Sequence, residues 1–280
     1  MNNKTQKRQA QPLSILLKAF VMFSAVLSFA VLVFLVAFII VKGIGYITPG
    51  LFSLNYTSEN VSLFPAMVNT VIMTLLTLLI AVPIGVFAAI FLVEYAGKGS
   101  KVVKVIRMTA ETLSGIPSIV YGLFGMMFFA TTLKWGMSLL AGSFTMVIMI
   151  LPLIMRTTEE ALKAVSDTFR EASFGLGAGK LRTIFKIVLP AAIPGILAGV
   201  ILATGRIVGE TAALIFTAGT VAQIPSNLFG SGRTLAVHMY ALSSEGMHMN
   251  EAYATAVILL IIVLLINGLS SWIARKLVKA

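Results

Sequence analysis

Few residues of this sequence could do chemistry inside its long apolar stretches, and the most prominent are Arg206 and Glu210. They lie four residues apart at the end of one such stretch, in the segment GRIVGETAAL. A charge in an apolar span costs about 3 kcal/mol even on lenient insertion scales, so such side chains normally face protein or water. Arg206 and Glu210 could neutralise each other across one helical turn, or Arg206 could meet an anion, since a guanidinium matches phosphate oxygens with two parallel hydrogen bonds. An interfacial salt bridge, or an arginine side chain that extends to the membrane interface, would explain Arg206 without a ligand.

The other groups of catalytic or ligand type are isolated. His238 and His248 lack neighbouring ligands at a convincing spacing, so we expect no metal site and no catalytic site. Glu111 is expected in the first turn of a helix, where the helix dipole favours an acid, and capping explains it better than gating. The segment GLGAGKL is not a phosphate-binding loop, because Phe174 stands where a glycine is required and a leucine follows the lysine. We therefore expect this chain to hold no cofactor, and any energy source to be another subunit.

The composition dictates the elements that must position these residues. Of the 280 residues, 58% are hydrophobic and 11% are charged, and the mean hydropathy is +0.99. A soluble core of this size could not enclose so much apolar side chain, so lipid must be the main solvent. The sequence predicts an all-α polytopic membrane protein with about six transmembrane helices, within residues 19–41, 64–93, 112–133, 135–155, 187–205 and 252–274.

The basic residues are distributed unevenly between the two sides that these helices define. Most of the 21 lysines and arginines fall in the N-terminal tail, the second and fourth loops and the C-terminal tail. The positive-inside rule makes that side cytoplasmic, with both termini inside. The predicted organisation is therefore a cytoplasmic tail (1–18), a first helix (19–42), an external loop (43–63), a five-helix domain (64–274) and a second cytoplasmic tail (275–280).

The fourth loop, residues 156–186, is the one cytoplasmic stretch long enough to have structure of its own. Its apolar residues recur at helical spacing, which predicts a short helix parallel to the membrane. Three glycines, Gly175, Gly177 and Gly179, predict a break after that helix.

The sequence from Glu171, EASFGLGAGKLRTIFKIVLP, resembles the EAA motif of type I ABC importer permeases. The residues at the motif positions are Glu171, Ala172, Ser173, Gly177, Ile187, Leu189 and Pro190, and the serine at the third position departs from the motif. In that family the segment is the coupling helix, which seats in a cleft of a cytoplasmic ATPase. The resemblance implies the same role here.

Three further segments narrow the resemblance to phosphate transport system permeases. They are ETLSGIPSIVYGLFG from Glu111, GRIVGETAAL, and RTLAVHMY from Arg233, the last resembling the PstA type more than its PstC-type partner. The resemblance covers roughly residues 65–271. It implies a multi-pass permease subunit, not an enzyme, in a bacterial cytoplasmic membrane. The implied partners are a PstC-type permease, a dimer of ATPase subunits that binds ATP, and an external phosphate-binding protein.

Two alternatives stand beside phosphate import. The substrate could be another oxyanion such as molybdate, tungstate or sulfate, because the binding protein largely selects it. A secondary transporter working without an ATPase is less favoured, since no inverted repeat is visible. Whether the substrate is phosphate or another oxyanion, we hypothesise that Arg206 and Glu210 line the anion gate between this subunit and its partner.

Two patterns remain outside these motifs. Small residues recur every four positions at Ala191, Gly195, Gly199 and Ala203, which permits close contact with a second helix, either within the chain or in a partner subunit. The uncharged stretch 211–232 would be a seventh crossing, which contradicts the charge distribution. It therefore predicts a half-helix or re-entrant turn at the outer face, where a binding protein could dock.

Overall fold

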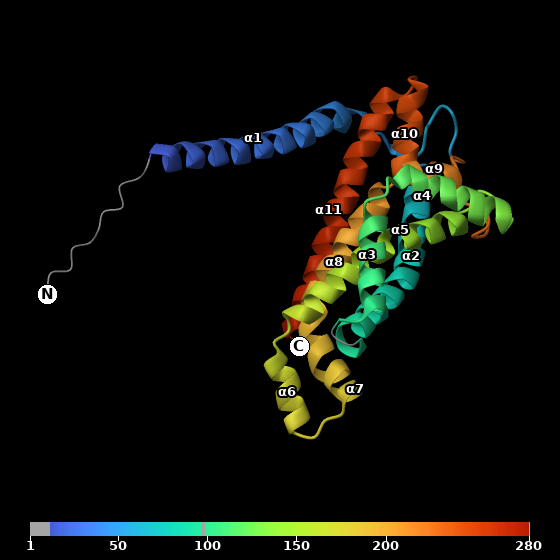
Figure 1. Ribbon diagram of the computed structural model, residues 1–280. Helices are drawn as coiled ribbons and strands as arrows, with labels where there is room; N and C mark the ends of the chain where they lie inside the picture. The colour runs from blue at the N-terminus through green and yellow to red at the C-terminus, as the bar shows by residue number, and fades with distance from the viewer. Residues whose placement is uncertain (1–11, 97–98, 280) are drawn as a thin grey trace.

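The computed structural model describes residues 12–96 and 99–279, which form helices and loops without a strand (Figure 1). The helices are α1 (Pro12–Gly43), α2 (Phe64–Ile90), α3 (Lys101–Ser114), α4 (Ser118–Gly125), α5 (Leu139–Ala164), α6 (Asp167–Gly175), α7 (Lys180–Thr183), α8 (Leu189–Gly209), α9 (Ala212–Thr217), α10 (Leu235–Glu245) and α11 (Met249–Lys279). In Figure 1, α6 and α7 lie at one end of the bundle and α9 and α10 at the other.

The helices long and apolar enough to span a membrane agree with the predicted number. Five are continuous, and a bent pair of helices makes a sixth candidate. The predicted third helix, residues 112–133, is wrong as one straight span, because α3 and α4 meet there at 101°. Pro117 lies at the bend; proline has no N–H to donate and pushes the residue before it out of the helical region.

This bend also corrects the interpretation of Glu111. The residue lies in the last turn of α3, not at a helix N-terminus. The helix dipole opposes an acid there, so capping is wrong as its explanation. Glu111 instead faces a cavity that is described below.

The core of the bundle forms around α5, which packs against α2 on one side and α8 on the other. Met146, Met149 and Ile150 of α5 are fully buried there, with Met73 of α2 and Ala203 of α8 beside them. These apolar contacts hold α2, α5 and α8 together.

The stripe of small residues on α8 faces α5. A Cβ added to Gly199 would lie 2.7 Å from the Cβ of Thr157, and one added to Gly195 would lie 2.6 Å from the Cβ of Ala161. Gly205, further along the same helix, has open space around it. Packing within the chain therefore accounts for the close approach at Gly195 and Gly199.

The ends of the chain differ from the predicted boundaries. Helix α1 begins at Pro12, inside the predicted tail 1–18, of which residues 1–11 lie outside the described part. It projects sideways from the bundle and meets α11 near Gly43, where an added Cβ would lie 2.6 Å from the carbonyl carbon of Tyr253 (Figure 1). Helix α11 continues to Lys279, so the predicted tail 275–280 is helical up to that residue; Ala280 lies outside the described part.

The stretch 211–232 is a short helix followed by irregular chain, as predicted. Helix α9 ends at Thr217, and the next helix begins only at Leu235. The chain across Pro225 is not helical, so this segment makes no continuous crossing.

We expect Gly199→Ala to destabilise the folded chain by about 1–3 kcal/mol, because the added methyl group overpacks the contact with Thr157. Gly205→Ala on the same helix is the matched control. It should be neutral or stabilising by up to about 1 kcal/mol, since alanine is the better helix former. Thermal unfolding in detergent would compare the two, and equal midpoints would contradict this account of the α5–α8 contact.

Candidate functional site

The predicted coupling segment is a helix, a turn and a second helix. Ser166 accepts a hydrogen bond from the backbone N–H of Thr168 (3.3 Å) and so caps α6. Gly177 has φ +83°, a left-handed conformation that glycine adopts without strain, and it reverses the chain between α6 and α7. The predicted glycine break is thus confirmed. The orientation of α6 relative to the membrane stays a prediction.

The residues of the EAA-like motif divide into an outer and an inner set. Glu171 and Ala172 are exposed, which leaves them free to contact another protein. Ser173 is buried and shares a hydrogen bond with Thr183 (2.8 Å), which holds α6 against α7.

The last three motif residues lie where α7 continues into α8. Ile187 is half-buried in a π-helical turn, Ile184–Val188, that joins the two helices. Leu189 begins α8, which continues the π-helical turn without a break. Pro190 therefore lies within the helical stretch Lys180–Gly209 and donates no hydrogen bond to the preceding turn. The motif therefore leads directly from the loop into a span.

Large apolar side chains project from the same end of the molecule. Leu176, at the turn, is 90% exposed, and Phe169, Phe174 and Leu181 are also exposed. An exposed apolar surface of this kind marks contact with another protein or with a membrane.

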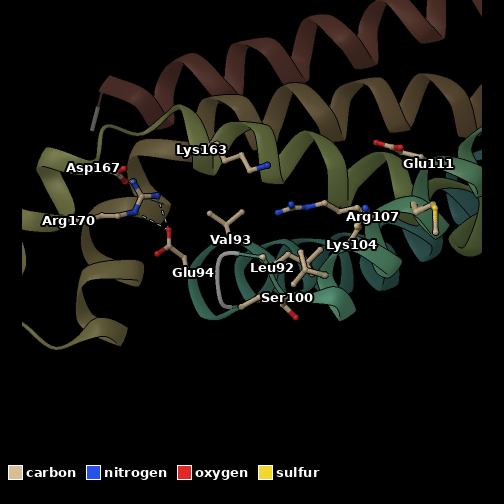
Figure 2. A pocket seen from close by; sticks show the side chains of 14 residues that line it. Leu92, Val93, Glu94, Ser100, Lys104, Arg107, Glu111, Lys163, Asp167 and Arg170 are labelled. Carbon is tan, nitrogen blue, oxygen red and sulfur yellow. Dashed lines mark hydrogen bonds and ion pairs between the residues drawn. The ribbon is translucent and has the colours of Figure 1, made fainter.

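A buried ion pair ties α6 to the end of the second span. A carboxylate oxygen of Glu94 accepts from Nη2 (2.8 Å) and Nε (3.1 Å) of Arg170, and both side chains are almost fully buried. Arg170 also donates to the backbone carbonyls of Leu162 and Val165. Figure 2 shows Arg170 and Glu94 facing each other at one end of a cavity. This pair was not predicted from the sequence, in which the available signal was an acidic residue at the end of an apolar helix.

Two cavities with charged walls open beside this ion pair. The first, of about 920 Å³, extends from Arg170 and Glu94 past Lys104 to Glu111 (Figure 2). The second, of about 380 Å³, shares Arg107, Glu111 and Lys163 with the first and reaches Arg206 on α8. The structure therefore brings Arg206 and Glu111, which are far apart in sequence, to the wall of one cavity.

The basic residues of the second cavity are paired, with one exception. Glu159 accepts from both Arg107 (2.7 Å) and Lys163 (2.5 Å), and Arg156 pairs with Glu160 (3.1 Å). Arg206 is half-buried and has no carboxylate partner among the described residues. Its guanidinium is therefore the cation of this cavity that can accept an anionic ligand.

Arg206 and Glu210 do not form the ion pair considered from the sequence. Glu210 follows the last residue of α8, and its carboxylate accepts from the backbone N–H of Ala213 (3.0 Å). That hydrogen bond satisfies an N–H in the first turn of α9. Mutual neutralisation across one helical turn is thus absent from this structure.

The amino-acid sequence is similar to those of a known protein family. The family described as binding-protein-dependent transport system inner membrane component matches residues 81–280. The probable ABC transporter permease protein YqgI of Bacillus subtilis (strain 168) is 34% identical over 273 residues, which cover 89% of this chain and 91% of that protein. The phosphate transport system permease protein PstA 1 of Mycobacterium tuberculosis (strain CDC 1551 / Oshkosh) is 35% identical over 207 residues, covering 73% and 67%.

A solved structure has the same fold. It is a bacterial alginate ABC transporter in complex with an alginate pentasaccharide-bound periplasmic protein, and it matches 95% of this chain and 96% of its own chain with a TM-score of 0.71 at 16% identity. The family match, the relatives and the helical architecture agree with one another. The chain belongs to the inner membrane components of binding-protein-dependent transport systems, as a PstA-like permease subunit of a type I ABC importer.

Proposed function

We propose that this chain is the membrane-spanning permease of an ATP-driven importer of inorganic phosphate. The observation that carries the proposal is the unpaired guanidinium of Arg206 on the wall of a cavity whose other basic residues are paired. A guanidinium binds phosphate oxygens through parallel charge-assisted hydrogen bonds. The PstA names of several relatives support phosphate in particular.

The proposed mechanism is alternating access at the interface with a second, PstC-type permease. Arg206 and Glu210 line the anion gate in this proposal, Arg206 by contacting phosphate and Glu210 by fixing the start of α9 beside it. An acid near the pathway also repels an anion, so Glu210 would keep phosphate on the Arg206 side of the gate.

The energy is proposed to come from a dimer of cytoplasmic ATPase subunits, and ATP is bound there and not in this chain. The exposed residues Glu171, Leu176 and Phe174 form the surface that docks on the ATPase. An external binding protein delivers the substrate at the opposite end, near α9 and α10 (Figure 1). The ion pair between Arg170 and Glu94 would transmit movement of α6 to the second span.

Another oxyanion is the competing substrate class, because sulfate, molybdate and tungstate present oxygens of similar geometry to a guanidinium. Uptake of radiolabelled phosphate by cells that lack their own high-affinity importer, with the complete complex expressed, distinguishes them. Uptake of radiolabelled sulfate or molybdate, with no uptake of phosphate, would assign the permease to that anion.

Gly177→Val should abolish phosphate uptake while the complex still reaches the membrane. Valine at φ +83° costs about 1–2 kcal/mol or more and distorts the turn between α6 and α7. Gly179→Val is the matched control, since that residue has φ −72° and open space around it. Equal uptake by the two variants would remove the proposed role of the turn.

Arg170→Met should destabilise the α6 end and uncouple ATP hydrolysis from uptake. It leaves Glu94 buried without a partner, at a cost of about 3–5 kcal/mol. Arg156→Met breaks an exposed pair and should cost at most about 1 kcal/mol. Thermal unfolding of the purified complex would measure the difference; a small effect for Arg170→Met would show that the ion pair does not hold α6 in place.

Arg206→Gln should lower phosphate uptake by about tenfold or more, because glutamine cannot replace hydrogen bonds from a charged donor. Lys42→Gln, which removes an exposed charge at the end of α1, is the control and should transport normally. Normal uptake by an assembled Arg206→Gln complex would exclude Arg206 from the anion pathway.

A further inference from the structure

A third cavity, of about 780 Å³, opens at the end of the bundle opposite α6. Its walls are residues 54–56 and 65, the segment 220–224 after α9, and Arg233. Among the described residues that line it, Arg233 is the only charged one. Asn55, Tyr56, Thr220 and Gln223 supply neutral polar groups around it.

Arg233 is a buried cation without a counter-ion. Its side chain belongs to a residue that is only 5% exposed, and Nε and Nη2 are buried without a hydrogen-bond partner. No ion pair to it is present in the described part of the chain. The ring of Tyr56 lies 4.7 Å from its guanidinium carbon, but a cation–π contact returns far less than the burial of an unpaired charge costs. An anion in the cavity would supply the missing compensation.

The backbone on both sides of Arg233 is held firmly. The Arg233 N–H donates to the carbonyl of Val221 (2.9 Å), and the next two residues lead into α10. The buried amide of Asn69 on α2 donates to the carbonyls of Gln223 (2.9 Å) and Arg233 (3.2 Å). The backbone that carries the Arg233 side chain at the cavity wall is therefore fixed, as a binding site requires.

His238, a titratable neighbour of Arg233, does not compete with it for an anion. It is fully buried and packs edge-on against Tyr56, with ring centres 6.2 Å apart. Burial and then the charge of Arg233 lower the pKa of His238 to about 3, against a smaller raising contribution from the Val61 backbone. The imidazole is thus neutral at physiological pH, and Arg233 alone gives the cavity its positive charge.

We propose that this cavity is an entry site for a small inorganic oxyanion, bound through Arg233 before the anion passes to the cavity that contains Arg206. The identification of the anion as phosphate rests on the proposed function. The site lies at the end where α9 and α10 meet the first external loop, which is the face proposed to receive the substrate.

The test is phosphate-dependent thermal stabilisation of the complete transporter complex, purified in maltoside detergent without the binding protein, at constant ionic strength. We expect Arg233→Met to remove the increase in unfolding temperature that phosphate binding in this cavity produces. Gln223→Glu, which adds a carboxylate to the cavity wall, should raise the apparent Kd for phosphate about tenfold or more. Asn227→Asp adds the same charge to an exposed residue outside the cavity and should leave the apparent Kd unchanged.

If phosphate stabilised both Arg233→Met and Gln223→Glu as much as the wild type, the proposal of an anion site in this cavity would be wrong. If Arg233→Met does not assemble, Gln223→Glu compared with Asn227→Asp decides alone. Phosphatidylglycerol added to the micelles tests a lipid headgroup as the source of the phosphate group. Stabilisation by that lipid through Arg233, with none by soluble phosphate, would overturn an entry site.

The test of the entry site and the test of the proposed function can fail independently of each other. Phosphate uptake by the wild-type complex, with no effect of Arg233→Met or Gln223→Glu on phosphate binding, would leave the importer in place and remove the entry site. Uptake of a different oxyanion, with stabilisation by that anion lost in Arg233→Met, would leave the entry site in place and replace the substrate.

Discussion

A charge in a bundle surrounded by lipid must find a partner, and the arrangement of this molecule follows from that constraint. Glu94 pairs with Arg170, which is far away in sequence, and Glu159 pairs with both Arg107 and Lys163 at the second cavity. The buried pair of Glu94 and Arg170 fixes the position of α6 relative to the second span, because removing Arg170 would leave the buried Glu94 carboxylate uncompensated. Arg206 and Arg233 have no carboxylate partner among the described residues, and each lies at a cavity wall.

The polar groups thus divide into those that maintain the fold and those available to a ligand. The paired residues cluster at the α6 end, where apolar side chains such as Leu176 are exposed for a partner protein. Arg206 lies in the last turn of α8, and Arg233 lies just before α10. In the proposed function, residues of the α6 end contact the ATPase and these two arginines bind the anion, so coupling and anion binding use different residues.

Much of this architecture could be predicted from sequence, because lipid imposes a simple length and polarity rule on each span. The five continuous helices and the irregular chain around Pro225 follow from that rule and from turn chemistry. The bend between α3 and α4 could not be predicted from hydropathy, which measures how apolar a segment is and not its direction. Because of the bend, Glu111 lies at the end of a helix and not at the start of one. The pairing of Glu94 with Arg170 needs the tertiary fold, as the two residues are 76 positions apart. Neither Arg206 nor Arg233 could be classed as unpaired before their neighbours were known.

The glycine contacts between α8 and α5 have a mechanical consequence. Where backbones approach as closely as at Gly195 and Gly199, neither helix can slide or rotate past the other without a collision with Ala161 or Thr157. Helices α5 and α8 must therefore travel as one rigid body when the transporter changes state. A movement that opens or closes the second cavity must then come from α3, which forms its other wall. The bend between α3 and α4 at Pro117 is the hinge for this movement.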